Sequence, residues 1–135
     1  MTAKVVKTLS PVFQQAGPVV PLTRPEAPPP APEILSLGKF FSQGKQLYED
    51  AGCLECHGAM GRGDGPTADS LKDEWGYRII PYDFTSGRMK RGNAVEDVYV
   101  TLLNGMGGTP MPSYADSLSE EETWALAFYV WSLAR

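Results

Sequence analysis

The C-terminal end of the chain combines an apolar stripe with a helix start signal. The apolar positions recur at intervals of three and four residues and are Trp124, Ala127, Phe128, Trp131 and Ala134. This spacing predicts a helix that buries one face. Ser119 stands before the stripe and Glu122 three positions later, a pair that predicts a capping box. We therefore expect an amphipathic helix that begins after Ser119.

A second apolar face lies in residues 38–51. Its positions recur near helical spacing and are Phe40, Phe41, Gly44, Leu47 and Tyr48. Gly52 follows directly, which predicts a left-handed residue that ends the helix. A glycine inside a helix costs about 1 kcal/mol relative to alanine, so Gly44 predicts a packing constraint. We expect the last helix to cross closely at this point, with Ala127 opposite Gly44.

A third helix is predicted over residues 93–105. Asn93 is placed to cap it with Glu96 in the capping-box position, and Gly105 to end it. The expected buried side consists of Val95, Val98, Tyr99, Leu102 and Leu103. Between residues 57 and 93 the chain is rich in loops, with at most a short helix around residues 67–75. The fold class is therefore a small all-α domain with three main helices and little core of its own, a deficit that a large apolar ring at its centre would repair.

Proline divides the chain into two parts. Eight of the twelve prolines lie between Pro11 and Pro32. Proline fixes φ and lacks a backbone donor, which favours extended, polyproline-like conformations. Residues 1–36 are therefore expected to be an arm or linker and residues 37–135 the folded domain. The alternative is that the apolar side chains near the N-terminus pack back on the domain.

The two cysteines and the only histidine stand together as Cys53-Leu54-Glu55-Cys56-His57. Both thiols of a C-x-x-C-H run can form thioethers with the vinyl groups of a haem, while the adjacent imidazole ligates its iron. A structural zinc site usually needs four ligands, and only three are present. A thioredoxin-like site would need a strand-helix-strand pattern, which is missing. The run predicts one covalently attached haem c, with Cys53 and Cys56 binding it and His57 as an iron ligand.

The second iron ligand cannot be another histidine of this chain. The candidates are a methionine or no protein ligand at all, and Met60 is too close to His57 in sequence to reach across the ring. Met89, Met106 and Met111 remain. Met111 lies between two prolines in a turn that begins with two glycines, and such a loop holds a side chain in place without a helix.

Residues 38–134 resemble the monohaem class I cytochromes c. The resemblance depends on residues 53–57, on the Thr-Pro-Met-Pro run at 109–112 and on the final helix. It implies that Met111 is the distal ligand, with Met106 or an ordinary buried methionine as alternatives. The glycine-rich loop 58–66 also resembles one branch of the family, and a backbone carbonyl near Pro66 is expected to accept the Nδ1 proton of His57. Donors to the haem propionates are expected among Trp75, Tyr77, Arg78, Tyr82, Arg88, Lys90 and Arg91.

The resemblance implies one-electron transfer by a His/Met-ligated haem rather than catalysis, as a carrier or as a module of a larger oxidoreductase. The alternative is a haem enzyme or a gas-binding sensor with an open or displaceable distal position. The expected partners are a redox donor and acceptor that bind transiently, with a fused or membrane-bound redox protein as a further option. The formal net charge of −4 argues against a nucleic-acid partner.

The cellular location follows from the cofactor. In this family haem attachment is completed outside the bacterial cytoplasm, so the chain is expected to be periplasmic or otherwise extracytoplasmic. Residues 1–20 lack the apolar stretch of about 7–15 residues that a signal peptide needs, and no run is long enough to span a bilayer. We therefore expect the signal, or a preceding domain, to lie outside this chain.

Overall fold

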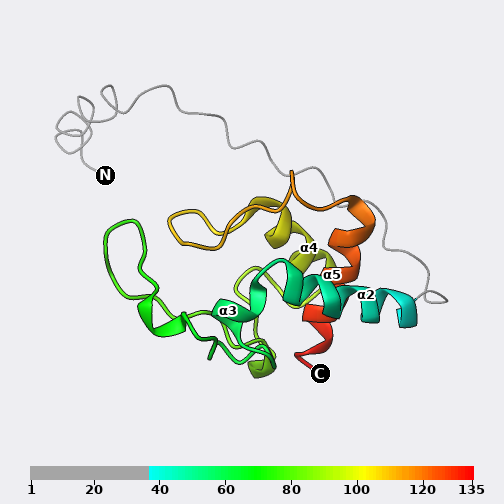
Figure 1. Ribbon diagram of the computed structural model, residues 1–135, viewed down its shortest axis with the longest axis horizontal. Helices are drawn as coiled ribbons and strands as arrows, with labels where there is room; N and C mark the ends of the chain where they lie inside the picture. The colour runs from blue at the N-terminus through cyan, green and yellow to red at the C-terminus, as the bar shows by residue number, and fades with distance from the viewer. Residues whose placement is uncertain (1–36) are drawn as a thin grey trace, which may run out of the picture.

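The computed structural model describes residues 37–135, so the predicted arm of residues 1–36 lies outside the described residues. The order of elements is α2 (Leu37–Asp50), α3 (Cys53–His57), η2 (Ala68–Ser70), η3 (Phe84–Ser86), α4 (Val95–Asn104) and α5 (Glu120–Ser132). Figure 1 shows α2, α4 and α5 grouped together, with long loops on one side of them. Within this part of the chain the only β pairing is an isolated bridge between Lys72 and Arg78. The all-α fold class is confirmed.

Helices α2 and α5 cross at Gly44, as its position inside a helix predicts. A Cβ at Gly44 would overlap the backbone of Ala125 and lie 2.8 Å from the Cβ of Tyr129. The expected close approach is therefore present, but the residue opposite is Ala125 and not Ala127. Tyr129 also packs against Tyr48 of α2, edge to face, with ring centroids 5.4 Å apart.

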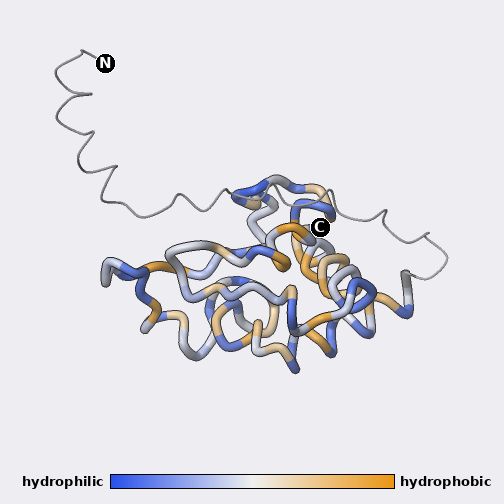
Figure 2. The backbone as a smooth tube through the Cα atoms, turned by 90° about the horizontal axis from the view of Figure 1, so that it is seen from above, coloured by the Kyte–Doolittle hydropathy of each residue, from blue (hydrophilic) through white to orange (hydrophobic). Residues whose placement is uncertain are grey.

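Helix α5 is buried on more than one face. The predicted capping box is confirmed, since Ser119 N donates to the Glu122 carboxylate at 2.8 Å and Glu122 N to Ser119 Oγ at 3.2 Å. The buried residues are Thr123, Trp124, Ala125, Leu126, Ala127, Tyr129 and Val130. Both α2 and α4 pack against α5, so the single predicted stripe was too narrow. In Figure 2 apolar positions gather along this helix near the C-terminus.

Helix α4 begins one residue later than the pattern indicates. Ala94 is the N-cap, and its N–H donates to the Asp97 carboxylate at 3.0 Å. Asn93 instead accepts a hydrogen bond from Met89 N at 2.9 Å, so the predicted pairing of Asn93 with Glu96 is wrong. Gly105 ends the helix as predicted, and its N–H donates to Thr101 O.

The segment after α2 positions the two cysteines. Gly52 is left-handed at φ 77°, as predicted, and it is also the N-cap of the five-residue helix α3. The sequence did not indicate this helix, because five residues are too few to show a helical period. The short helix expected around residues 67–75 is present as η2 at Ala68–Ser70. Among residues 37–135 the structure contains no helix with the length and apolarity needed to cross a lipid bilayer.

Candidate functional site

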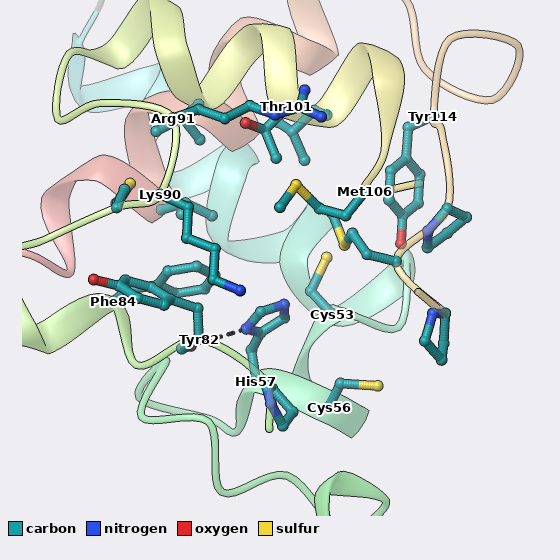
Figure 3. Close-up of a pocket in the computed structure, with 18 of the residues that line it drawn as sticks. Cys53, Cys56, His57, Tyr82, Phe84, Lys90, Arg91, Thr101, Met106 and Tyr114 are labelled. Carbon is teal, nitrogen blue, oxygen red and sulfur yellow. Dashed lines mark hydrogen bonds between the residues drawn. The ribbon is translucent and has the colours of Figure 1, made fainter. Parts of the chain in front are cut away.

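A large apolar cavity lies between α3, α4 and the loops that follow them. Counted with the space open to solvent, it has a volume of about 1230 Å³. The four residues predicted to bind haem and iron all line it, and they are Cys53, Cys56, His57 and Met111. Figure 3 shows the two cysteines and His57 reaching the cavity from the same short helix.

Both cysteines of α3 carry free thiols, and no disulfide joins them. Burial raises the pKa of the Cys53 thiol to about 11. The Cys56 sulfur lies 3.4 Å from Thr67 Oγ1. In a haem-loaded protein these two sulfurs would be thioethers, so the thiol pKa describes the chain before attachment. Within residues 37–135 no group of three or more His, Cys, Asp and Glu side chains is placed to hold a metal ion.

The imidazole of His57 is fixed on two sides. Its Nδ1 lies 3.1 Å from the carbonyl oxygen of Tyr82, and its ring stacks on Phe84 with centroids 4.5 Å apart. Burial lowers the pKa of His57, and the hydrogen bond to Tyr82 partly opposes this. A neutral ring that donates from Nδ1 keeps the Nε2 lone pair for a metal. The expected acceptor near Pro66 was wrong, because the carbonyl belongs to Tyr82.

The glycine-rich loop packs on α3 instead of supplying that carbonyl. Gly63 N donates to His57 O at 2.8 Å and Gly65 N to Cys56 O at 3.1 Å. A Cβ at Gly65 would lie 2.6 Å from the carbonyl oxygen of Leu54. The loop therefore satisfies the carbonyls at the end of α3, and glycine at position 65 permits the close approach.

Met111 lies in a loop that is closed by its own hydrogen bonds. Met106 N donates to Met111 O at 3.1 Å, Thr109 N to Met106 O at 3.1 Å, and Met111 N to Thr109 Oγ1 at 3.2 Å. Met89 and Met106 also line the cavity, so three thioethers face it. Met60 is 60% exposed and does not line it. Met89, Met106 and Met111 therefore remain the candidates for the second iron ligand, as they were from the sequence alone.

Three of the seven expected propionate donors line the cavity, and they are Tyr82, Lys90 and Arg91. Arg91 Nη2 donates to Gly105 O at 3.1 Å, which holds its guanidinium at the cavity wall. Figure 3 shows Lys90 extending into the cavity toward the region of His57. The other four, which are Trp75, Tyr77, Arg78 and Arg88, lie elsewhere.

The sequence analysis did not predict a role in the site for two tyrosines of the cavity wall. Tyr48 is buried, and its hydroxyl donates to Gly58 O at 2.7 Å, at the end of α3. Tyr114 donates to Ala51 O at 3.3 Å, just before α3. The helical pattern assigns Tyr48 to a buried face but gives no sign of its polar contact. Tyr114 has no sequence signal beyond its place soon after Met111.

The residues present fit a haem. The cavity is apolar, and the side chains that line it include two thiols, an oriented imidazole and three thioethers. Two cations at its wall can pair with carboxylates. This donor set matches covalent attachment through sulfur with imidazole and thioether ligation.

Comparison with known proteins agrees with a haem-binding site. The sequence model of the family described as "Cytochrome c" matches residues 41–134. A chain from the reducing HAO-like protein complex of Kuenenia stuttgartiensis has a similar structure, with a TM-score of 0.71 and 44% sequence identity. The match covers 80% of this chain and 47% of that one, so the present chain spans about half of the length of that relative. A search of curated proteins found no match.

Proposed function

The chain belongs to the cytochrome c family and carries a covalently bound haem c, and we propose that it transfers single electrons with His57 and Met111 as the iron ligands. The observation that carries this proposal is the shared cavity. The short helix with the C-x-x-C-H run and the closed loop with Met111 line the same apolar space. Haem-based electron transfer follows from the family, and the proposal adds the identity of the two iron ligands.

Each residue has a defined task in this proposal. The sulfurs of Cys53 and Cys56 attach the cofactor, and His57 offers Nε2 because Tyr82 O holds Nδ1. Met111 supplies a soft thioether, which stabilises the reduced state and raises the potential. When bound, the haem iron gains or loses one electron. The apolar wall keeps water away from it, which limits the reorganisation that accompanies a change of charge.

Partners and location belong to the same proposal. The chain acts outside the cytoplasm and exchanges electrons with other redox proteins through short-lived, small interfaces. It works as a carrier or as the electron-transfer module of a larger oxidoreductase. The similarity to one half of a chain in a multiprotein redox complex supports the modular form.

The ligand pair is tested by visible spectroscopy of the oxidised, haem-loaded protein. We expect the weak long-wavelength sulfur-to-iron band in the wild type and in Met106→Leu and Met89→Leu, and its loss in Met111→Leu. If the band is present in Met111→Leu but absent in Met106→Leu, the distal ligand is Met106 and not Met111. A wild type that lacks the band and binds carbon monoxide tightly when reduced would favour the alternative, an open haem enzyme or gas sensor.

A further inference from the structure

A short hairpin at residues 71–79, here the Trp75 hairpin, projects beside the cavity. Ile79 N donates to Leu71 O at 3.1 Å and Asp73 N to Tyr77 O at 2.9 Å. The Asp73 carboxylate accepts from Trp75 N at 3.0 Å and from Tyr77 N at 2.9 Å. A side chain that binds two backbone N–H groups fixes a turn. The hairpin is therefore an ordered element, although Trp75 at its tip is 76% exposed.

The tip of the hairpin contacts the loop that carries Met111. Glu74 N donates to Gly108 O at 3.0 Å. Gly108 is left-handed at φ 78°, and the ring of Trp75 lies 3.6 Å from the position that its Cβ would occupy. Apart from Gly108 itself and its two chain neighbours, Trp75 is the only described residue with atoms within 4 Å of that position. The indole ring therefore lies beside Gly108 of the Met111 loop, on the side where a side chain would stand.

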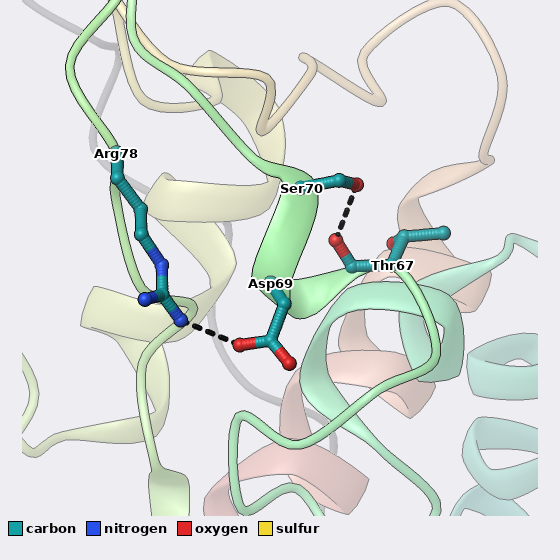
Figure 4. Close-up of polar contacts among 4 residues, drawn as sticks. All are labelled: Thr67, Asp69, Ser70 and Arg78. Carbon is teal, nitrogen blue, oxygen red and sulfur yellow. Dashed lines mark hydrogen bonds and ion pairs between the residues drawn. The ribbon is translucent and has the colours of Figure 1, made fainter.

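The base of the hairpin is linked to the haem-attachment helix. Arg78 forms an ion pair with Asp69 of η2, as Figure 4 shows. Thr67, which directly precedes η2, donates from both its N–H and its hydroxyl to Glu55 O, at 2.9 and 2.8 Å. Glu55 lies between the two cysteines. A continuous set of contacts thus runs from α3 through the hairpin to the Met111 loop.

We infer that the Trp75 hairpin is a brace between the haem-attachment helix and the Met111 loop, and that Trp75 is a positioning residue that keeps Met111 on the iron. This inference rests on the proposed function, because it takes Met111 as the ligand. An exogenous ligand reaches the iron only when the Met111 loop opens, so its apparent affinity scales with the open fraction. The hydrogen bond at Gly108 and the indole contact stabilise the closed loop and thereby reduce that fraction.

The test is an imidazole titration of the oxidised, haem-loaded protein, followed by visible absorption. Trp75→Ala is expected to raise the apparent affinity for imidazole roughly three- to tenfold, the size expected for losing one modest contact. Trp75→Phe is expected to restore most of the wild-type value, since an aromatic ring still covers Gly108. Arg78→Gln releases the base of the brace and is expected to give a smaller shift in the same direction, because exposed ion pairs contribute little.

Tyr77→Ala is the matched control. Tyr77 lies in the same hairpin and is 71% exposed, but its ring is not among the atoms within 4 Å of the Gly108 Cβ position. Its removal is expected to leave the imidazole affinity unchanged. Equal affinities for Trp75→Ala and Tyr77→Ala would overturn the brace, whether both rise or neither does. Denaturant unfolding of each variant separates loop opening from a loss of global stability.

The two proposals fail in different ways. If the wild type lacks the sulfur-to-iron band, Met111 ligation is wrong and the brace fails with it. If the band is present, and neither Trp75→Ala nor Arg78→Gln changes the imidazole affinity, the ligand assignment stands and the brace alone is rejected.

Discussion

His57 Nδ1 lies 3.1 Å from the carbonyl oxygen of Tyr82, which is 25 residues further along the chain. This contact links the attachment helix α3 to the loop that contains Tyr82, which forms part of the cavity wall. A carbonyl oxygen accepts a hydrogen bond and cannot donate one, so Nδ1 carries the hydrogen and Nε2 keeps its lone pair. The fold therefore selects the tautomer that a metal needs.

Phe84 is expected to hold this arrangement in place. Its ring stacks on His57, and its backbone N–H donates to Gly61 O at 2.8 Å. Phe84→Ala removes the ring from one face of the imidazole, and for a half-buried aromatic side chain the expected loss of stability is about 2 kcal/mol. Denaturant unfolding of the haem-loaded protein measures it. Tyr82→Phe keeps the carbonyl and is the control, so a similar loss in both variants would contradict a specific role for the stacking.

Covalent attachment through Cys53 and Cys56 predicts how the cofactor behaves on denaturation. In the wild type the haem is expected to stay with the polypeptide in acidified organic solvent, because two thioethers hold it. A Cys53→Ala, Cys56→Ala double variant is expected to release it, and each single variant to retain it through one bond. Mass spectrometry of the denatured chain distinguishes these states. Release from the wild type would rule out attachment through these sulfurs.

The sequence predicted those parts of the fold that depend on residue type. The capping box of Ser119 and Glu122, the left-handed Gly52 and the close approach at Gly44 all follow from properties of the residues themselves, and all are present. Helix α5 shows the limit of predicting burial from helical periodicity. Periodicity assumes one buried face, whereas α5 packs against both α2 and α4, and no local pattern reveals a second partner helix.

The candidate site likewise contains features that the sequence predicts and features that it does not. A C-x-x-C-H run is visible in the sequence because its chemistry lies in side chains at fixed spacing. The acceptor at Tyr82 is a backbone carbonyl, and every residue has one, so sequence offers no means of choosing it. The contact of Trp75 with Gly108 is likewise long-range and depends on how two loops fold together. Such contacts are set by the tertiary structure alone.

Gly44 is predicted to tolerate no side chain. A Cβ there would overlap the Ala125 backbone, so Gly44→Ala must push α2 and α5 apart. Overpacking of this kind costs typically ~1–3 kcal/mol, which outweighs the gain of about 1 kcal/mol in helix propensity. Gly38 lies in the same helix with nothing within 4 Å of its Cβ position, so Gly38→Ala is expected to be neutral or stabilising. Equal unfolding midpoints for the two variants would contradict the close crossing.

Tyr48 is predicted to make stability depend on alkaline pH. Its side chain is 1% exposed and donates to Gly58 O at 2.7 Å, and burial raises its pKa well above the ordinary value. An unfolded tyrosine loses its proton near pH 10, while the folded one keeps it to higher pH. The contribution of Tyr48 to stability is therefore complete below pH 10 and is lost as the pH rises above it.

Comparison with Tyr48→Phe isolates this contribution. At pH 7 the variant is expected to be less stable by about 1–2 kcal/mol, because Gly58 O loses its donor in a buried place. Above pH 10 the gap to the wild type should narrow by about 1.4 kcal/mol per pH unit, since the variant has no proton to lose at this position. Tyr114, whose pKa is raised to about 12 by burial, still titrates in both proteins and cancels in the difference. Urea unfolding of both haem-loaded proteins from pH 7 to 11 measures the gap, and a gap that stays constant across pH 10 would show that Tyr48 ionises as freely in the folded state as in the unfolded one.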